Sequence, residues 1–244
     1  MPSGNDYNKI ASFYDDVIGT DLFGSLLKNY LNKKYRKGSK ILELGCGTGI
    51  NLLPLSKYFK IEGIDISEKM LKIAKKKIPG SVFYRQDIRK FSVKKKYDVI
   101  LCLYDTINHI KGLKSWYSIF SKVSSHLTEE GVFIFDINTV SKLDLMSSHP
   151  ASVIKFGKNF LIVSVTNTSS GNKENSYNWN MKIFEAGGKN KFSFTENNIL
   201  EYAYSISEVK KELNRSFSSV KTYNSELKPT SKNSGRIFFI CKNF

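Results

Sequence analysis

The stretch Ile41–Gly49 constrains the fold of this chain more than any other, because it runs from apolar residues directly into three alternating glycines. A buried strand is predicted over Lys40–Leu44, which includes the first part of this stretch, and a helix is predicted over Ile50–Tyr58 after the glycines. A tight turn between a strand and a helix needs positive φ at some positions, and a missing Cβ lets the backbone approach a bound molecule closely. The stretch therefore predicts a glycine-rich binding loop at the start of an α/β fold.

Beyond this loop the chain alternates between short apolar runs and stretches with helical spacing. Strands are expected at 61–66, 82–86, 97–103, 131–137 and 236–242, and helices at 67–77, at 113–126 and from Ser205 onward. Such alternation is typical of repeated strand–helix units, which place parallel strands in one sheet with helices on its faces. We therefore predict an α/β protein with a mostly parallel sheet.

Two regions flank this core. The apolar residues of Tyr7–Tyr35 have helical spacing, so one or two helices should cover the sheet. Phe160–Thr166 and Tyr177–Phe184 alternate like strands around turn-forming residues at 167–175, and 191–204 could extend this hairpin. The predicted division is covering helices in 1–38, a core in 39–143 and 205–244, and an antiparallel β insertion in 144–204 that serves as a lid.

The composition narrows the classes of protein. Cys46, Cys102 and Cys241 are widely separated and form no CxxC pair, so neither a disulfide framework nor a zinc site is indicated. The formal charge of +16 could attract nucleic acid or a phosphate-bearing molecule, but the lysines are scattered, as on a solvated surface. Because the chain has no apolar run of bilayer length and no secretory signal pattern, we expect a cytoplasmic protein without a membrane partner.

Acidic residues stand where the second and third predicted strands end. Asp65 closes the second strand, so its carboxylate should lie at the carboxyl edge of the sheet and accept both hydroxyls of a ribose. Asp87, after the third strand, could accept the exocyclic amine of an adenine in the same crevice. The loop itself reads GxGxG with Glu43 in the strand before it, unlike the GxGxxG of dinucleotide folds or the GxxxxGK of P-loops. A nucleoside site is therefore predicted.

The residues Glu43–Gly49, Asp65, Gln86–Asp87 and Tyr97–Ile100 together resemble the class I S-adenosylmethionine-dependent methyltransferases, over roughly residues 5 to 140. The resemblance implies a Rossmann-like, doubly wound, mostly parallel seven-stranded sheet with N-terminal covering helices and an antiparallel β-hairpin insertion. It also implies S-adenosyl-L-methionine as the cofactor. The cofactor-binding residues expected on this basis are Tyr14, Glu43, Gly45, Cys46, Gly47, Asp65, Ile66, Met70, Gln86, Asp87, Ile88 and Leu103. A different nucleotide-binding fold, or a domain without activity, is the alternative.

A narrower resemblance lies in Pro79–Phe91, Asp105–Ile110 and Gly131–Asn138, together with Tyr7 and Phe13–Asp15. These segments are similar to a subgroup that contains deoxyamino-sugar N,N-dimethyltransferases. Members of that subgroup often carry a His or Arg close to the last aromatic strand of the insertion, whereas this chain reads Asn-Asn-Ile-Leu-Glu-Tyr-Ala-Tyr over 197–204. This departure leaves the identity of the acceptor open.

Methyl transfer from a sulfonium is an in-line displacement, so a protein mainly has to hold the acceptor behind the methyl group. His109 follows the fourth strand, where it could orient the acceptor or remove its proton, and Tyr7 and Tyr14 could present ring faces to the sulfonium. Packing roles are the alternative for all three. Asp105, Asn108 and Asp136 are expected at the same edge, and Trp179, Tyr177 and Tyr202 are candidate pocket walls. His109 and Tyr7 are the predicted catalytic residues, with no metal.

The function predicted from the sequence is transfer of a methyl group to a nitrogen or oxygen of a small-molecule acceptor, with a nucleotide-linked amino sugar as one candidate. Its diphosphate would suit the basic surface. An RNA methyltransferase is a rival reading because of the charge, but no NPPY-like or DPPY-like base pocket, paired catalytic cysteines or RNA-binding module is visible. A non-catalytic S-adenosylmethionine-binding protein is a second rival. Either a monomer or a homodimer is compatible with the sequence.

Overall fold

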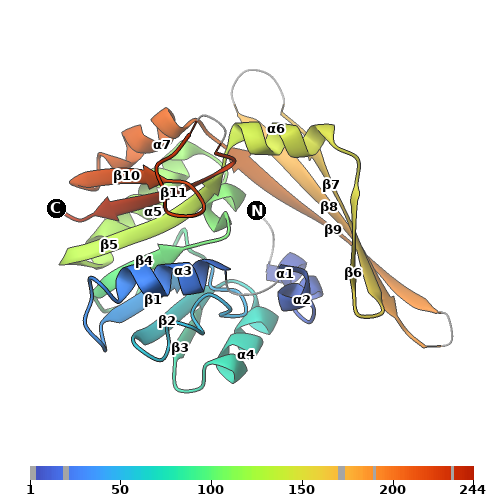
Figure 1. Ribbon diagram of the computed structural model, residues 1–244, viewed down its shortest axis with the longest axis horizontal. Helices are drawn as coiled ribbons and strands as arrows, with labels where there is room; N and C mark the ends of the chain where they lie inside the picture. Colours follow the sequence, from blue (N-terminus) through green and yellow to red (C-terminus); the bar gives the residue numbers. More distant parts are fainter. Residues whose placement is uncertain (1–3, 19–21, 170–173, 189–190, 232–233) are drawn as a thin grey trace.

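The central element of the fold is a seven-stranded sheet, which the computed structural model shows beside a smaller four-stranded sheet (Figure 1). The structure describes residues 4–18, 22–169, 174–188, 191–231 and 234–244. The strands of the large sheet are β1 (Lys40–Leu44), β2 (Lys60–Asp65), β3 (Val82–Arg85), β4 (Tyr97–Cys102), β5 (Leu127–Asn138), β10 (Ser219–Tyr223) and β11 (Arg236–Lys242). They lie in the order β10-β11-β5-β4-β1-β2-β3, and only the pairs that include β11 are antiparallel. The predicted seven-stranded, mostly parallel sheet is therefore confirmed.

Helices cover both faces of this sheet. On one face, α3 (Leu22–Leu31) and α4 (Glu68–Lys77) bury Leu27 and Leu71 against Ile41 of β1. On the other face, α5 (Leu113–His126) and α7 (Ile206–Leu213) pack with Leu42, the next residue of the same strand. Neighbouring side chains of a strand point to opposite faces, so apolar residues at both positions require cover on both sides. This layered core holds the loops at the carboxyl ends of the strands in fixed positions.

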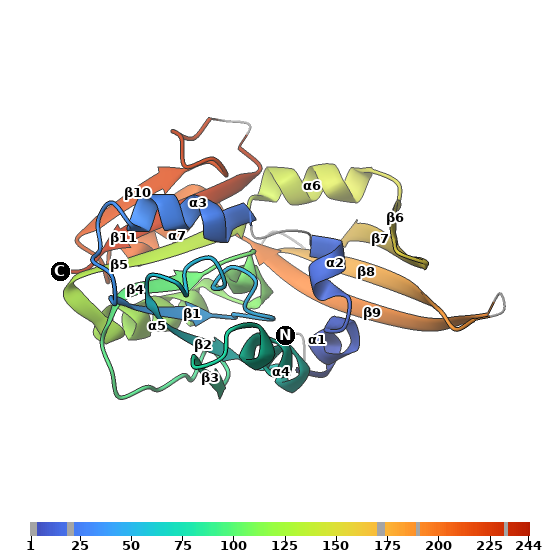
Figure 2. The same cartoon turned by 60° about the horizontal axis from the view of Figure 1, so that its bottom comes forward.

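The four-stranded sheet is antiparallel throughout and consists of β6 (Ser152–Phe156), β7 (Asn159–Asn167), β8 (Asn175–Ala186) and β9 (Phe192–Ala203). It confirms the predicted antiparallel insertion and extends it by one further strand. Three helices lie near its inner side: α1 (Gly4–Ile10) contacts β9 and α4, α2 (Tyr14–Ile18) contacts β6, and α6 (Val140–Ser148) contacts β7 and β8. Figure 2 shows α1 and α2 between the two sheets. The N-terminal helices thus bridge the insertion and the core.

The structure differs from the sequence prediction at several elements. Residues 50–58 form consecutive turns and no regular helix: Leu52 N–H donates to the Gly49 carbonyl, and Leu55 N–H to that of Leu52. Pro54 explains the difference, because it has no N–H to donate and its ring crowds the carbonyl four residues earlier. The short strands β6 and β10 and the helix α6 were not predicted, and β5 begins at Leu127 and not at Gly131. The turn predicted at 167–175 lies partly outside the described residues.

Gly63 of β2 permits the glycine-rich loop to lie directly against the sheet. A Cβ at this position would be 2.7 Å from Cys46 Sγ and 2.8 Å from Phe83 Cδ1, and the backbone there has no positive φ. We therefore predict that Gly63→Ala lowers the free energy of unfolding by about 1–3 kcal/mol through overpacking. Urea unfolding of the purified chain measures this. Gly187→Ala is the matched control, because its nearest neighbour would be 3.6 Å away; equal effects of the two substitutions would contradict the prediction.

Candidate functional site

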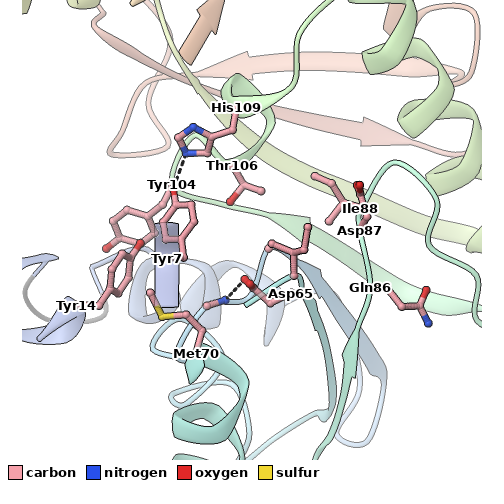
Figure 3. A pocket seen from close by; sticks show the side chains of 13 residues that line it. Tyr7, Tyr14, Asp65, Met70, Gln86, Asp87, Ile88, Tyr104, Thr106 and His109 are labelled. Carbon is pink, nitrogen blue, oxygen red and sulfur yellow. Dashed lines mark hydrogen bonds between the residues drawn. The ribbon is translucent and has the colours of Figure 1, made fainter. Parts of the chain in front are cut away.

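A narrow cavity lies at the carboxyl ends of β1, β2 and β4 (Figure 3). It is lined by Tyr7, Tyr14, Gly45, Gly47, Asp65, Ile66, Met70, Gln86, Asp87, Ile88, Tyr104, Thr106 and His109. Most of the residues expected at the cofactor therefore lie around one cavity, together with both predicted catalytic residues. Tyr104 and Thr106 were missed, although their position directly after the fourth predicted strand could have indicated them.

The glycine-rich loop approaches the opposite wall so closely at Gly45 that this residue has no room for a side chain. Gly45 has a φ of +70°, and a Cβ there would lie 2.3 Å from Thr106 Cγ2. Gly47 also has a positive φ, of +51°, and this conformation is energetically unfavourable for residues that carry a Cβ. The Gly45 N–H donates to the Ile64 carbonyl at 2.8 Å, which fixes the start of the loop to β2. The loop is thus a preformed backbone cradle facing the cavity.

Asp65 joins this cradle to the following helix. Its Oδ2 accepts the Gly47 N–H and its Oδ1 accepts the Ser67 N–H, both at 2.8 Å. Burial raises the pKa of the Asp65 carboxyl, although the backbone donors oppose that shift. Each carboxylate oxygen can accept a second hydrogen bond, so the group remains able to receive two hydroxyls from the cavity.

The segment after β3 forms the far side of the cavity. Both carboxylate oxygens of Asp87 accept from Arg89 Nε, at 3.0 and 2.9 Å. Burial opposes ionisation of Asp87, but Arg89 holds the pKa of that carboxyl below its usual value. Gln86 is held through Ser92, whose N–H donates to Gln86 Oε1 at 2.9 Å. Asp87 therefore has a cationic partner of its own beside the cavity.

Three residues expected at the cofactor do not line the cavity. Glu43 is buried beneath the loop, where its Oε1 accepts from Asn51 Nδ2 at 3.2 Å, and burial raises its pKa to about 8. Cys46 packs under the loop near Gly63, and Leu103 is buried in the core. The structure places these three behind the loop and strand that form the wall.

Tyr7 and His109 meet at the edge of the cavity, although 102 positions separate them in the sequence. The Tyr7 hydroxyl lies 2.8 Å from His109 Nε2, and His109 Nδ1 lies 3.2 Å from the Leu200 carbonyl oxygen. A carbonyl only accepts, so Nδ1 carries the proton and the Tyr7 hydroxyl donates to a bare Nε2. Burial lowers the pKa of His109 and raises that of Tyr7. Both side chains are therefore neutral near pH 7.

A second cavity of about 430 Å³ opens on the other side of this pair. Tyr7, Tyr14, Tyr104 and His109 line both cavities and form the boundary between them. Its remaining walls come from α1, α2, the turn between them, α6, all four strands of the insertion and the core: Ile10, Phe13, Val17, Met146, Ser152, Ile154, Leu161, Val163, Trp179, Met181, Ile199, Glu201, Asp105, Asn138 and Arg236. Trp179 was a predicted wall; Tyr177 and Tyr202 are absent from this lining. The insertion thus forms one side of a mainly apolar cavity next to the core.

The floor of the second cavity carries a charged network. Arg236 donates from Nη2 to Asp105 Oδ1 at 2.6 Å and from Nη1 to Asp136 Oδ2, which also accepts the Asp105 N–H at 3.0 Å. Tyr104 and Asp105 both have positive φ, of 53° and 49°, so this turn is strained and these bonds hold it. Asp136 and Asn108, both expected at this edge, are fully buried behind the lining.

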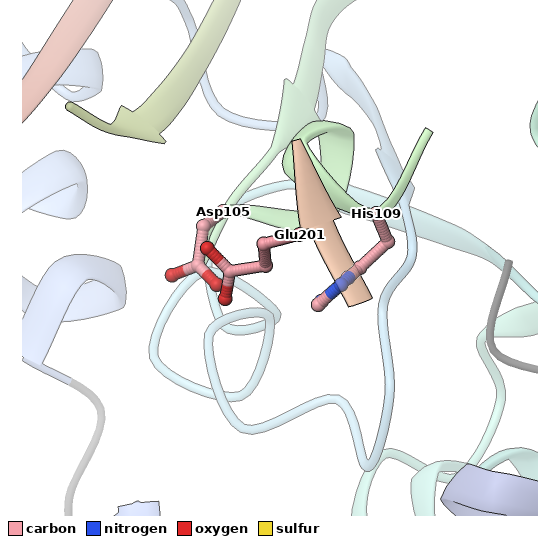
Figure 4. Close-up of side chains that lie close together, drawn as sticks. All are labelled: Asp105, His109 and Glu201. Atoms are coloured by element: carbon pink, nitrogen blue, oxygen red, sulfur yellow. The ribbon is translucent and has the colours of Figure 1, made fainter. Parts of the chain in front are cut away.

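Glu201 of β9 joins Asp105 and His109 at this floor. A carboxylate oxygen of each acidic residue and a ring nitrogen of His109 all lie within 4.8 Å of one another (Figure 4). Sequence reasoning missed Glu201, because it lies in the segment that departs from the related enzymes. The position of Glu201 becomes clear only from the structure, in which β9 contacts the segment Thr106–His109 of the core.

Comparison with known proteins gives the family of the core. Residues 41–131 match the family described as a methyltransferase domain. A putative methyltransferase of Bacillus subtilis is 30% identical over 142 residues, which are 56% of this chain and 57% of that protein. A dTDP-3-amino-3,6-dideoxy-alpha-D-glucopyranose N,N-dimethyltransferase of Streptomyces fradiae is 29% identical over 141 residues, 55% of each chain. The chain therefore spans a little over half the length of the curated relatives it matches.

The likeness of the fold extends further than the likeness of the sequence. The crystal structure of an S-adenosylmethionine-dependent methyltransferase from Clostridium acetobutylicum superposes with a TM-score of 0.83, covering 97% of this chain and 98% of the other at 24% identity. Among the described residues, no helix has both the length and the apolarity needed to cross a bilayer. Residues 41–131 thus match a methyltransferase domain, and the chain has the fold of the class I S-adenosylmethionine-dependent methyltransferases.

Proposed function

We propose that this chain is an enzyme that transfers a methyl group from S-adenosyl-L-methionine to a nitrogen or oxygen atom of a small-molecule acceptor. One observation supports the proposal: the cavity at the backbone cradle that Asp65 fixes adjoins a second cavity at Tyr7 and His109. Because the two cavities share lining residues, a donor and an acceptor can lie next to each other there, and in-line transfer requires the acceptor atom directly behind the methyl group.

The first cavity suits this cofactor on geometric grounds. The space that a Cβ on Gly45 would need is already taken by Thr106, so the cradle presents backbone alone to the methionine end. Asp65 keeps free lone pairs for the ribose hydroxyls, and Ile88 offers an apolar contact for the adenine. Bound there, the cofactor supplies an electrophilic methyl group on a positively charged sulfur. The ring faces of Tyr7 and Tyr14 lie beside the same cavity and would stabilise that charge.

Tyr7 and His109 would manage the proton that the acceptor loses. Nε2 of His109 is a bare base, and the Tyr7 hydroxyl donates to it. When the Tyr7 oxygen takes a proton from the acceptor, its own proton can pass to Nε2, so that the tyrosine stays neutral throughout. The Leu200 carbonyl accepts from Nδ1 and orients the ring for this transfer.

The relatives indicate which acceptors to test first. The Streptomyces fradiae relative is named for a dTDP-linked amino sugar. A nucleotide-linked amino sugar is therefore one candidate acceptor for this chain.

We predict that Asp65→Ala weakens S-adenosylmethionine binding by about 1–3 kcal/mol, because the ribose hydroxyls lose a charged acceptor. Isothermal titration calorimetry measures the dissociation constant. Asp98→Ala is the control, since Asp98 also accepts a backbone N–H, from Lys40 at 2.8 Å, and does not line the cavity. Unchanged affinity in Asp65→Ala would overturn the ribose assignment.

We predict that His109→Ala lowers kcat about 10- to 100-fold while the affinity for the cofactor stays within twofold, because the base acts on the acceptor's proton. Steady-state kinetics and calorimetry on the same preparation separate the two effects. His149→Ala is the control: its Nδ1 also meets a backbone carbonyl, that of Leu145, and it lines neither cavity. A rate equal to that of the unaltered protein would remove the proposed role of His109.

We predict that the ring of His109 stays neutral until the pH falls below 6.5, the ordinary histidine value, because burial disfavours the imidazolium. The stabilisation due to this neutral ring is complete above pH 6.5 and is lost as the pH falls, since the unfolded chain then binds more protons. ¹⁵N NMR of the imidazoles should show Nδ1 protonated and Nε2 bare, with His109→Asn assigning the signal. A signal from protonated Nε2 would contradict the hydrogen-bond assignment.

A further inference from the structure

We propose that the second cavity takes an amine on a compact apolar body, such as an arylalkyl or alicyclic amine, and that Glu201 receives the proton of its ammonium form. This inference rests on the proposed methyltransferase function and names the class of its acceptor. A phosphate-bearing part of any acceptor has no place inside this cavity.

The walls of the cavity argue for an apolar body. Phe13 from the N-terminal segment faces a cavity whose opposite side carries Leu161, Met181 and Ile199 of the insertion. Phe13, Leu161 and Ile199 are each less than 7% exposed, so the walls are already shielded from bulk water. Apolar surface buried there gains about 25 cal/mol per Å², whereas buried sugar hydroxyls lose free energy wherever they find no partner.

The distribution of cations argues against a phosphate. The chain contains 38 Lys and Arg residues, yet among the described residues Arg236 is the only one of them that lines this cavity. Its guanidinium is already engaged by Asp105 and Asp136. Lys142 is not among the lining residues, and its ammonium group donates to Asn138 Oδ1 at 2.8 Å. A buried diphosphate would therefore find no unengaged cation among the described residues that line the cavity, and an uncompensated buried charge is strongly unfavourable.

The carboxylates at the floor argue for an ammonium group. Asp105 and Asp136 pair with Arg236, Glu201 lies beside Asp105, and Lys142 is the other cation near them, so three carboxyl groups share two cations. Glu201 is 2% exposed, and its Oε2 accepts from Asn138 Nδ2 at 3.0 Å. Burial and the neighbouring Asp105 raise the pKa of Glu201 well above its ordinary value. A cation that enters would take the place of the proton that Glu201 otherwise holds.

Aromatic side chains near Glu201 would also stabilise a bound cation. Tyr7, Tyr104 and Trp179 line the same cavity as Glu201, and aromatic ring faces attract cations. The rings and the Glu201 carboxylate can together surround an ammonium group, whereas a neutral hydroxyl carries no positive charge for them to stabilise.

The proton balance of the transfer can be written with these groups. An N–H proton of the ammonium passes to the Glu201 carboxylate and frees the nitrogen lone pair. That lone pair forms a bond to the methyl carbon while the bond between sulfur and carbon breaks and its electrons stay on sulfur. The methylated nitrogen then releases one further proton to the Tyr7 and His109 pair, which leaves a neutral amine as the product.

The experiment compares three probes on the full chain: 2-phenylethylamine, 2-phenylethanol with the same body and a hydroxyl, and UDP-glucosamine as a phosphate-bearing amine. Methylation with S-adenosylmethionine is followed by mass spectrometry, and binding to the chain saturated with S-adenosylhomocysteine is measured by calorimetry. We expect kcat/KM and affinity for 2-phenylethylamine to exceed those for each of the other two probes at least tenfold.

Two variants test the residues. Glu201→Gln should raise KM for 2-phenylethylamine at least tenfold and leave the S-adenosylmethionine dissociation constant within twofold. Met181→Ala should weaken binding of both phenyl probes equally, because it removes only apolar wall. Lys182→Ala is the matched control, since Lys182 follows Met181 on β8 but is exposed and lines neither cavity.

The outcomes separate this inference from the proposed function. Stronger binding and faster methylation of UDP-glucosamine would overturn the inference and leave the methyltransferase function standing. Failure of all three probes to bind, or an unchanged KM in Glu201→Gln, would also overturn it. Failure of the chain to bind S-adenosylmethionine would instead overturn the proposed function itself.

Discussion

The contact of Arg236 with Asp105 and Asp136 joins three parts of the chain that are distant in sequence. Arg236 opens β11, Asp136 lies near the end of β5, and Asp105 follows β4 in a turn with positive φ. Without the guanidinium, the two carboxylates would repel each other and no ion pair would stabilise the strained turn. Because His109 follows that turn, the boundary between the two cavities depends on this one ion-pair network.

Much of the fold and of the first cavity could be predicted because local chemistry fixed it. The first strand runs directly into glycines, and the next strand ends at an Asp. This pattern predicts that Gly45, Gly47 and Asp65 lie together, and all three line the first cavity. The local pattern was misleading at one segment: apolar spacing predicted a helix at 50–58, but Pro54 has no N–H to donate, and the segment forms consecutive turns. The short edge strand β10 was missed because Val220 and Tyr223 are three positions apart, which is not the alternation of a half-buried strand.

The second cavity could not be predicted in the same way, since long-range contacts build it. Asn108 donates to the carbonyls of both Asn138 and Tyr202, and so ties the loop after β4 to β5 and β9. These partners stand up to 94 positions away, and no spacing rule links them. These contacts bring Glu201 to the floor of the cavity. The sequence of residues 197–204 departs from the related enzymes and by itself does not indicate this position.

The position of Tyr7 on α1 has a consequence for how this protein exchanges its ligands. A helix of seven residues is not stable on its own in water. Contacts such as those of Asn8 with Ser67 and of the Asp6 carbonyl with Asn197 hold α1 in place. If α1 were to detach, the hydroxyl partner of His109 would leave with it and both cavities would lose a wall. Entry of a ligand by that route would switch the proton pathway off, and docking of the helix would restore it, so chemistry would proceed only in the closed state.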